Sequence, residues 1–230
     1  MQVQDQFLSE SKKYQMINNT ILNIFLSYLI GSFSGSLFLG KLKGVDIRKH
    51  GSGNAGGTNA FRTQGFVFAL GVLMIDILKG YICAKYISYF MLLNSEYIGT
   101  SELNILLCGL SAIIGHVYPV YHKFKGGKGA GAAIGMLLAL HPTSVGIALL
   151  HWIIILILTG FVGFGTMVAA SSIPIYLYIS GENLTFNYYP ILSIFLALFI
   201  IFTHRSNILR MINGNENQFE KAMIIKKLFN

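Results

Sequence analysis

Long apolar stretches are the feature that most constrains how this chain can fold. A helix that crosses a lipid bilayer needs about 20 mostly apolar residues, and stretches near this length follow one another along most of the sequence. Of the 230 residues, 53% are hydrophobic and only 11% are charged, whereas soluble domains carry about 25% charged residues. The chain therefore lacks the polar surface of a soluble protein. We predict an all-α integral membrane protein.

Seven stretches are apolar enough to be transmembrane helices. We expect them at residues 20–40, 66–90, 103–121, 129–147, 145–161, 165–180 and 188–204. The fourth and fifth run together, and His141-Pro142 marks the expected break because proline lacks the N–H that a helix needs. The chain then divides into a polar N-terminal tail (1–19), a seven-helix membrane domain (20–210) and a C-terminal tail (211–230).

Basic residues predict how the helices are oriented. The chain has a formal net charge of +8, and most of its basic residues follow the first, third and seventh apolar stretches. They are Lys41, Lys43, Arg48, Lys49 and Arg62, then Lys123, Lys125 and Lys128, then Arg205, Arg210, Lys221, Lys226 and Lys227. The intervening loops near Glu96–Glu102 and Gly181–Asn187 contain no lysine or arginine. With seven helices, the basic side is cytoplasmic, the N-terminus lies outside and the C-terminus is cytoplasmic. Because the charges gather at helix ends, we expect no nucleic-acid partner.

The first of three polar motifs is "HGSGNAGGTNAFR", residues 50–62. Glycine can adopt the positive φ values that turn successive backbone N–H groups toward an anion. An arginine fork can bind phosphate with two parallel hydrogen bonds. We predict a phosphate site rather than an ordinary surface loop. Its candidate catalytic residues are Ser52 and Arg62, and its candidate substrate-binding residues are Gly53, Asn54, Thr58 and Asn59.

The second motif is "GHVYPVYHKFKGGKG", residues 115–129. Its glycines allow close approach of a ligand, its lysines supply charge, and the apolar helix that follows would point its N-terminus at an anion. Lys128 and His116 are candidate catalytic residues, and Lys125, Gly126, Gly127 and Gly129 are candidate substrate-binding residues. For Lys125, a headgroup anchor is a serious alternative, and a histidine such as His116 is often only structural.

The third motif is "THRSNILRMINGNE", residues 203–216. His204, Asn207 and Arg210 are spaced three residues apart, so they line one helix face loosely. We predict a catalytic role for Asn207 and substrate binding by His204, Arg205 and Arg210. A basic cap on the last helix is an equally good account of Arg210.

Asp76 and Lys79 are charged residues inside the second apolar stretch. Unpaired charges there cost several kcal/mol, but residues three apart can pair on one helix face. We expect a buried pair that supports the site; an ion pair near the membrane surface is the alternative.

Taken together, the motifs resemble those of the bacterial acyl-phosphate:glycerol-3-phosphate acyltransferase family (PlsY). The family patterns match from Ser52 to Arg62, from Gly115 to Gly129 and from His204 to Arg210, and Asp76-x-x-Lys79 fits the second span. The resemblance covers nearly the whole chain. It implies seven transmembrane helices with the motifs on the cytoplasmic face of a bacterial cell membrane.

The resemblance also implies the reaction. A fatty acyl group passes from acyl-phosphate to the 1-hydroxyl of glycerol 3-phosphate, giving lysophosphatidic acid and phosphate, the first step of phospholipid synthesis. Fixed positive charge would hold the two phosphate-bearing substrates, and Ser52, Asn207 or backbone N–H groups would stabilise the oxyanion. A substrate phosphate oxygen can take the hydroxyl proton, with His116 and His204 as protein alternatives.

Four positions depart from the family pattern: Gly57 replaces alanine, Ala132 replaces a hydroxyl residue, Gly163 replaces one of two serines three apart, and Asn215 replaces a basic residue. The second of those serine positions keeps its hydroxyl as Thr166, which we predict to bind substrate.

We expect no cofactor and no metal, because no His, Asp or Glu cluster has ligand spacing.

Two other functions compete with acyl transfer. A membrane anion or phosphate transporter would use similar glycines and basic residues, but the sequence lacks an obvious internal repeat and its charges gather on one side. A non-catalytic lipid-binding scaffold would accommodate the four departures. The sequence does not predict the oligomeric state.

Overall fold

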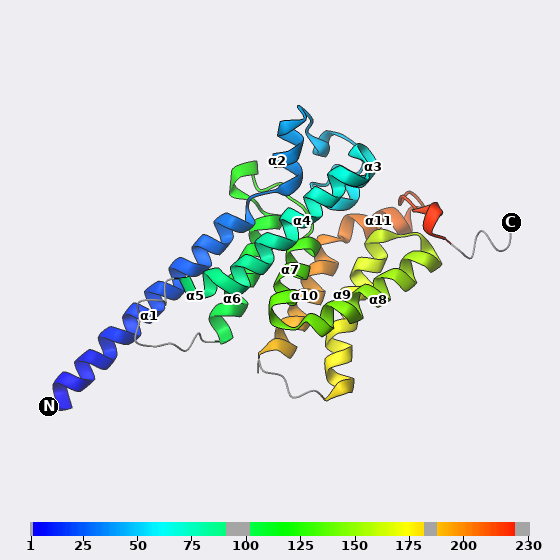
Figure 1. Ribbon diagram of the computed structural model, residues 1–230. Helices are drawn as coiled ribbons and strands as arrows, with labels where there is room; N and C mark the ends of the chain where they lie inside the picture. Colours follow the sequence, from blue (N-terminus) through cyan, green and yellow to red (C-terminus); the bar gives the residue numbers. More distant parts are fainter. Residues whose placement is uncertain (1, 91–101, 182–187, 224–230) are drawn as a thin grey trace.

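The computed structural model describes residues 2–90, 102–181 and 188–223, and these ranges contain helices and no β-strand (Figure 1). Most of the predicted loops Glu96–Glu102 and Gly181–Asn187, and the last seven residues of the C-terminal tail, lie outside the described residues. The first half contains α1 (Gln2–Gly31), α2 (Gly35–Leu42), the 3₁₀ turn η1 (Ile47–Lys49), α3 (Gly57–Gln64), α4 (Phe66–Ile82), the π-helical turn η2 (Cys83–Ile87) and α5 (Ser88–Phe90). The second half contains α6 (Glu102–Val117), the 3₁₀ turn η3 (Val120–His122), α7 (Ala130–Leu140), α8 (Pro142–Thr159), α9 (Val162–Ser180), α10 (Tyr189–Thr203), α11 (Arg205–Ile212) and the 3₁₀ turn η4 (Glu220–Ala222).

Each predicted apolar stretch corresponds to an apolar helix or to a bent pair of helices. Among the described residues, 4 helical segments are long and apolar enough to cross a membrane, and the count rises to 6 if each bent pair is one span. The 4 segments are Phe66–Phe90, Glu102–His122, Pro142–Thr159 and Val162–Ser180. The bent pairs are Ile17–Gly31 with α2 and α10 with α11. The number seven therefore stays a prediction that depends on α7.

Helix α7 is shorter than the predicted stretch 129–147. It has 11 residues, which rise about 16 Å, or roughly half of the hydrocarbon core. It ends at Leu140, and α8 begins at Pro142, so the predicted break at His141-Pro142 is confirmed.

The predicted stretch 20–40 is a bent pair of helices, since α1 ends at Gly31 and α2 continues at an angle of 42°. The Ser34 hydroxyl accepts a hydrogen bond from the N–H of Leu37 at 3.5 Å and so caps α2. The interruption leaves the carbonyl of Phe33 free, and Lys79 Nζ donates to it at 2.8 Å. The break thus provides an acceptor for a lysine inside the bundle.

Asp76 and Lys79 form the predicted buried pair. Lys79 Nζ lies 3.0 Å from Asp76 Oδ1, and both side chains are 4% exposed. His116 Nδ1 on α6 approaches the same oxygen at 3.3 Å. The three side chains therefore join α4, α6 and, through Phe33, the α1–α2 break.

Helices α4 and α7 pack through small residues. A Cβ added to Gly80 on α4 would meet the carbonyl oxygen of Ala132, and one added to Gly135 on α7 would meet that of Ile77. Gly131 and Gly135 are four residues apart, as in the small-residue pattern that lets membrane helices approach closely. One core cluster then joins α6, α7, α9 and α10, with Ile113 and Met136 fully buried.

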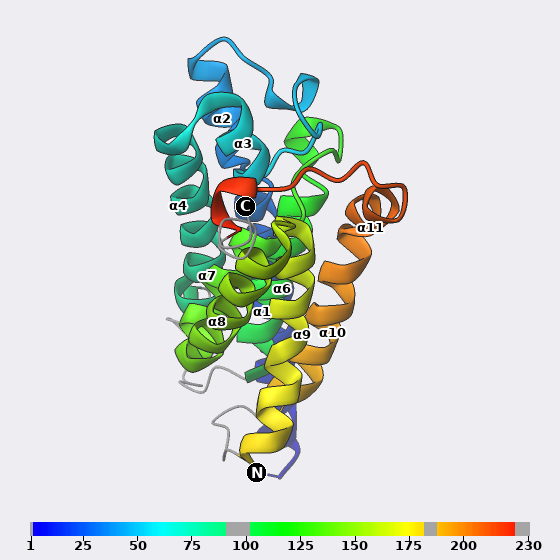
Figure 2. The same cartoon turned by 90° about the vertical axis from the view of Figure 1, so that its right-hand side faces the viewer.

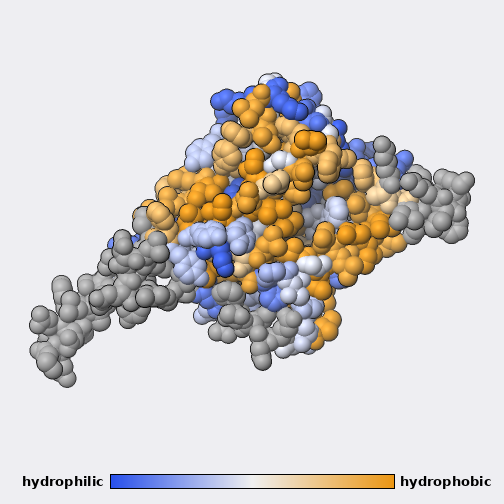
Figure 3. All heavy atoms as spheres, viewed as in Figure 1, coloured by the Kyte–Doolittle hydropathy of each residue, from blue (hydrophilic) through white to orange (hydrophobic). Residues whose placement is uncertain are grey.

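The motifs lie at one end of the bundle. Figures 1 and 2 show α2 and α3 at the end opposite the N-terminus of α1, and α11 lies toward the same end as α2 and α3. Figure 3 shows hydrophobic side chains over the middle of the face in view, with hydrophilic ones at the α2–α3 end. Large apolar side chains such as Val67 and Ile191 are exposed, as expected for a surface in contact with lipid.

We expect Gly80→Ala to lower the unfolding temperature of the purified protein. The added methyl group would collide with the backbone of Ala132, and overpacking of this kind costs about 1–3 kcal/mol. Gly146→Ala on α8 is the matched control, because nothing lies within 4 Å of a Cβ at that position and alanine is the better helix former. Thermal unfolding of the three proteins in detergent measures the difference. An undiminished unfolding temperature in Gly80→Ala would contradict the close packing of α4 on α7.

Candidate active site

All three motifs contribute to one cavity of about 260 Å³. It is lined by Asn54, Val117, Tyr118, Phe124, Lys125, Gly126, Gly127, Lys128, Thr203, Arg205 and Ser206. Six of these residues are among the predicted site residues, and they run from Asn54 to Arg205 in sequence. The structure therefore brings the motifs together, although no pairing between them could be read from sequence.

Lys128 is central to this arrangement. Its Nζ donates a hydrogen bond to Asn207 Oδ1, and its carbonyl accepts one from the Thr203 hydroxyl at 2.9 Å. Burial, followed by the charge of Arg210, lowers the pKa of Lys128 to about 8. Lys128 is thus a half-buried ammonium group at the junction of the second and third motifs.

Glu216 was not predicted as a site residue, yet it links Arg210 to Asn207, the residue that binds Lys128. Its carboxylate accepts from Asn207 Nδ2 at 3.1 Å and from Arg210 Nε at 2.7 Å. Only 2% of its side chain is exposed. A carboxylate within a basic segment was the available signal in the sequence. Its ion pair with Arg210 makes it a counter-ion within this cluster.

Arg62 approaches the cluster from α3. Its Nη2 donates to the backbone carbonyl of Asn217 at 3.3 Å. Burial is the main reason that the pKa of Arg62 lies below its usual value; Glu216 opposes this shift and Arg210 adds to it. Arg62 therefore belongs to the same electrostatic neighbourhood as Lys128, without lining the cavity itself.

In the first motif, Asn59 holds the loop together. Its buried amide donates to the carbonyls of Ile47, His50 and Asn54 at 2.9–3.1 Å, and its oxygen accepts from Ser52 N–H at 2.9 Å. These bonds occupy the side chain that we predicted to bind substrate. Of the other predicted residues, Asn54 lines the cavity, while Ser52, Gly53 and Thr58 do not.

In the second motif, His116 lies beneath the glycines. A Cβ at Gly127 would meet the His116 imidazole, and one at Gly126 would meet the His116 carbonyl. The two N–H groups are also used, because Gly126 donates to Val117 at 3.2 Å and Gly127 to His116 at 3.1 Å. Gly129 has a φ of +91° and precedes α7. The His116 side chain is only 3% exposed and lies against Asp76. It supports the loop from below and does not line the cavity.

In the third motif, His204 and Asn207 are buried beside the cavity wall. His204 Nδ1 lies 2.7 Å from the carbonyl of Ile200, so this nitrogen carries the proton. Asn207 fits because residue 163 is glycine, since a Cβ there would lie 2.6 Å from Asn207 Nδ2. The Thr166 hydroxyl donates to the Val162 carbonyl at 2.9 Å, within its own helix. Gly163 thus lies directly against the Asn207 amide.

The residues described in the structure contain no group of three or more His, Cys, Asp or Glu that could hold a metal ion. The cavity is instead lined by basic side chains and hydroxyl groups, with aromatic and aliphatic side chains at Val117, Tyr118 and Phe124. An anionic group attached to an apolar chain fits this combination.

Comparison with known proteins identifies the family. The family described as glycerol-3-phosphate acyltransferase matches residues 21–214. The chain belongs to the glycerol-3-phosphate acyltransferase family. The resemblance inferred from the motifs is thereby confirmed.

Relatives in this family match most of the chain. A glycerol-3-phosphate acyltransferase of Chlorobium limicola is 38% identical over 226 residues, which cover 86% of this chain and 96% of its own. One of Thermosipho melanesiensis is 35% identical over 198 residues, with 86% and 92% covered. The crystal structure of PlsY, an integral membrane glycerol 3-phosphate acyltransferase, is similar in its glycerol 3-phosphate form with a TM-score of 0.76 and 32% identity, covering 92% of this chain and 99% of that one. Its lysophosphatidic acid form gives a TM-score of 0.74, also at 32% identity, with 87% and 95% covered. Family membership and the apolar helices make this chain a multi-pass membrane acyltransferase.

We expect the acyl-transfer rate to fall as the pH rises through about 8, because Lys128 loses its charge near its lowered pKa. The charged form predominates below this value, so the rate should be at its plateau near neutral pH. Lys128→Arg should move the alkaline limb to higher pH, since a guanidinium stays protonated. Rates normalised to each protein's maximum, measured across the alkaline range, test this. An alkaline limb at the same pH in both proteins would assign the titration to another group.

Proposed function

We propose that this protein transfers a fatty acyl group from acyl-phosphate to the 1-hydroxyl of glycerol 3-phosphate, at the cytoplasmic face of a bacterial cell membrane. The products are lysophosphatidic acid and inorganic phosphate. The observation that carries the proposal is the convergence of three motifs on Lys128, in a cavity with both basic and apolar walls. The names of the relatives support glycerol 3-phosphate as the acceptor.

The charge distribution favours two phosphate-bearing substrates. Such substrates repel each other, and a site must offset that repulsion with fixed positive charge. Lys128 and Arg205 line the cavity, and Arg62 and Arg210 lie in the same electrostatic neighbourhood. Glu216 is the counter-ion of Arg210, and it also accepts a hydrogen bond from Asn207, which binds Lys128.

The chemistry needs little activation. The hydroxyl oxygen of glycerol 3-phosphate attacks the acyl carbon of the mixed anhydride, an ester C–O bond forms, and the C–O bond to phosphate breaks. The hydroxyl proton passes to a phosphate oxygen, so that phosphate leaves carrying it. Lys128 would stabilise the departing charge, and holding both substrates in line lowers the barrier further.

His204 is the protein alternative for receiving the proton. With its proton on Nδ1 and donated to Ile200, its Nε2 can accept a hydrogen bond. His116 is less suited, because it is buried against Asp76 and covered by Gly127. The oxyanion candidates remain Ser52 and Asn207; Asn207 already uses its amide nitrogen on Glu216.

The acyl chain of the donor explains a site at the membrane boundary. Each methylene group that leaves water contributes about 0.8 kcal/mol, so a long chain stays in the apolar layer while its phosphate reaches the basic end. Val117, Tyr118 and Phe124 provide the apolar wall at this boundary.

Acyl transfer should depend on the donor and on Lys128. We expect purified protein to form lysophosphatidic acid from acyl-phosphate and glycerol 3-phosphate, with release of phosphate, and to form none from acyl-CoA or acyl carrier protein. Lys128→Ala should lower the turnover at least 100-fold, on the scale of losing a group that stabilises the transition state. Activity with acyl-CoA alone would refute the donor, and full activity of Lys128→Ala would refute the site. Phosphate uptake into vesicles without product would favour the transporter.

For topology, we propose seven membrane spans with the N-terminus outside and the basic end in the cytoplasm. The grouping of α2, α3 and α11 at one end supports this orientation.

Cysteine labelling should mark Lys123→Cys and Ser180→Cys from opposite sides of the membrane. Lys123 belongs to the basic end, and Ser180 is the exposed last residue of α9. The native Cys83 and Cys108 are buried and should stay unlabelled in folded protein. Intact cells are treated with a membrane-impermeant thiol reagent, and inverted vesicles with the same reagent. Labelling of both positions in one preparation alone would contradict the proposed topology.

A further inference from the structure

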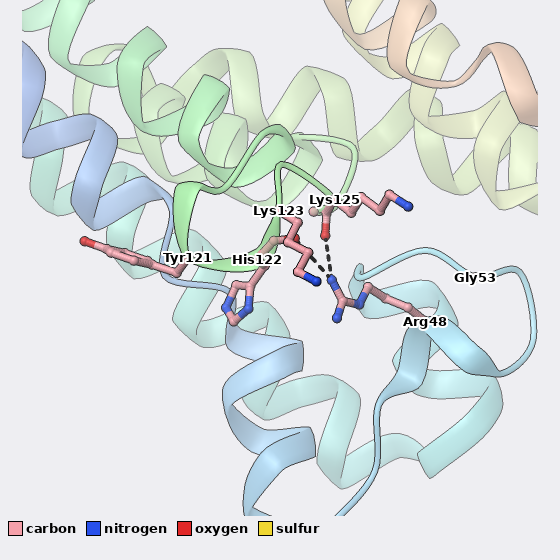
Figure 4. A pocket seen from close by; sticks show the side chains of 7 residues that line it. Arg48, Gly53, Tyr121, His122, Lys123 and Lys125 are labelled. Carbon is pink, nitrogen blue, oxygen red and sulfur yellow. Dashed lines mark hydrogen bonds between the residues drawn. The ribbon is translucent and has the colours of Figure 1, made fainter.

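A second cavity lies beside the candidate active site. It has a volume of about 540 Å³ and shares Lys125 and Gly126 with the active-site cavity. One wall of this cavity is formed by Arg48 and Gly53, and the other by the segment 121–126 of the second motif (Figure 4). The proposed reaction gives Arg48 no role, although its guanidinium lies between the two loops.

Arg48 is held rigidly by Asp46. Its Nε donates to Asp46 Oδ1 at 3.0 Å and its Nη2 to Asp46 Oδ2 at 2.8 Å, which is a bidentate pair. The backbone N–H of Arg48 donates to Oδ1 as well, at 3.0 Å. Hydrogen bonding from Arg48 is the main reason that the pKa of Asp46 is lowered, so the pair stays charged. The remaining nitrogen of the fork is thereby aimed in one direction.

That nitrogen reaches the second motif. Arg48 Nη1 donates to the carbonyl of His122 at 3.4 Å and to that of Lys125 at 3.3 Å, as the dashed lines in Figure 4 show. These two carbonyls lie before and after Lys123 and Phe124. Arg48 therefore contacts both ends of a four-residue turn, residues 122–125.

The 122–125 turn is strained. Lys123 has a φ of 55° and Phe124 a φ of 59°, and they are the non-glycine residues with positive φ among those the structure describes. A side chain with a Cβ disfavours this region, and two such residues in succession are unusual. Strain of this kind persists only where surrounding contacts hold it. The turn includes Lys125 and is followed by Lys128, and both lysines line the active-site cavity.

We propose that Arg48 is a positioning residue: it holds the strained 122–125 turn against η1, which directly precedes the first motif, and so sets the position of the lysines in the active site. A headgroup anchor is a poorer account, because the fork of Arg48 is bonded to the Asp46 carboxylate and to two backbone carbonyls. The catalytic part of the proposal rests on the proposed function, while its effect on the turn does not.

Arg48→Lys tests the fork without removing the charge. A lysine ammonium cannot reach the Asp46 carboxylate and both carbonyls at once. We expect faster amide hydrogen exchange in residues 120–128, unchanged exchange in α4 and α6, and a fall of about tenfold in kcat/KM for glycerol 3-phosphate, since small misplacements of binding groups cost this much or more. Lys49→Arg is the matched control, because it makes the reverse substitution at the exposed neighbouring residue. It should change neither the amide exchange rates nor kcat/KM.

Relief of the strain should rescue the variant. Glycine accepts positive φ without the Cβ penalty, so adding Lys123→Gly to Arg48→Lys should return both exchange and kcat/KM most of the way to the parent values. Lys123→Ala removes the same charge but keeps a Cβ at a φ of 55°, and it should rescue neither.

The results separate the possibilities. Four outcomes would each overturn the proposal. In Arg48→Lys, these are unchanged amide exchange in residues 120–128, faster exchange in all helices alike, or an unchanged kcat/KM despite a loosened turn. The fourth is equal rescue by Lys123→Gly and Lys123→Ala. Because exchange is measured without substrate, an inactive parent protein would refute the proposed function and leave the result on the turn standing.

Discussion

A single carboxylate inside the membrane domain organises the active end of this protein. Asp76 on α4 lies 3.0 Å from Lys79 Nζ and 3.3 Å from His116 Nδ1. A buried charge is costly unless it is paired and hydrogen-bonded, so the neighbouring elements are shaped around it. The α1–α2 break supplies a carbonyl to Lys79, and Gly131 brings the start of α7 against the Asp76 Cβ. Through His116, the same group supports the glycines of the second motif.

The consequence is a site that is built on rigid elements although its contacts come from loops. Asn59 fixes the first loop, His116 supports the second, and the Thr203 hydroxyl fastens Lys128 to the end of α10. Preorganised charge of this kind needs no rearrangement when a phosphate arrives, which is the main electrostatic advantage of an enzyme site over water. Several glycines and amides that look like ligand contacts in the sequence are used to build this frame.

Much of the architecture could be predicted from the sequence, because apolar length and basic flanks are strong signals. The apolar segments, the His141-Pro142 break and the Asp76–Lys79 pair follow from composition and spacing alone. The division between ligand contact and support could not be predicted, since Asn54 and Asn59 look alike in a motif, and only the folded loop shows that Asn59 is buried and bonded to backbone while Asn54 lines the cavity. Glu216 and Arg48 were missed as site residues because a charge reveals its partner only after folding. The bend at 32–34 was missed although residues 31–36 read Gly-Ser-Phe-Ser-Gly-Ser, because only the folded chain shows that the Ser34 hydroxyl caps a new helix.

The segment after α11 has a practical consequence for work on this protein. Residues 214–223 fold back so that Phe219 N–H donates to the Gly160 carbonyl at 2.7 Å and the Phe219 ring packs edge-on against Phe61 at 5.7 Å. This return brings Glu216 to Asn207 and Arg210. Reporter fusions that map membrane topology are often joined directly after the last apolar helix. Here such a junction would delete the counter-ion of the cationic cluster, so fusion proteins should keep the chain through Met223 and carry their tags beyond it.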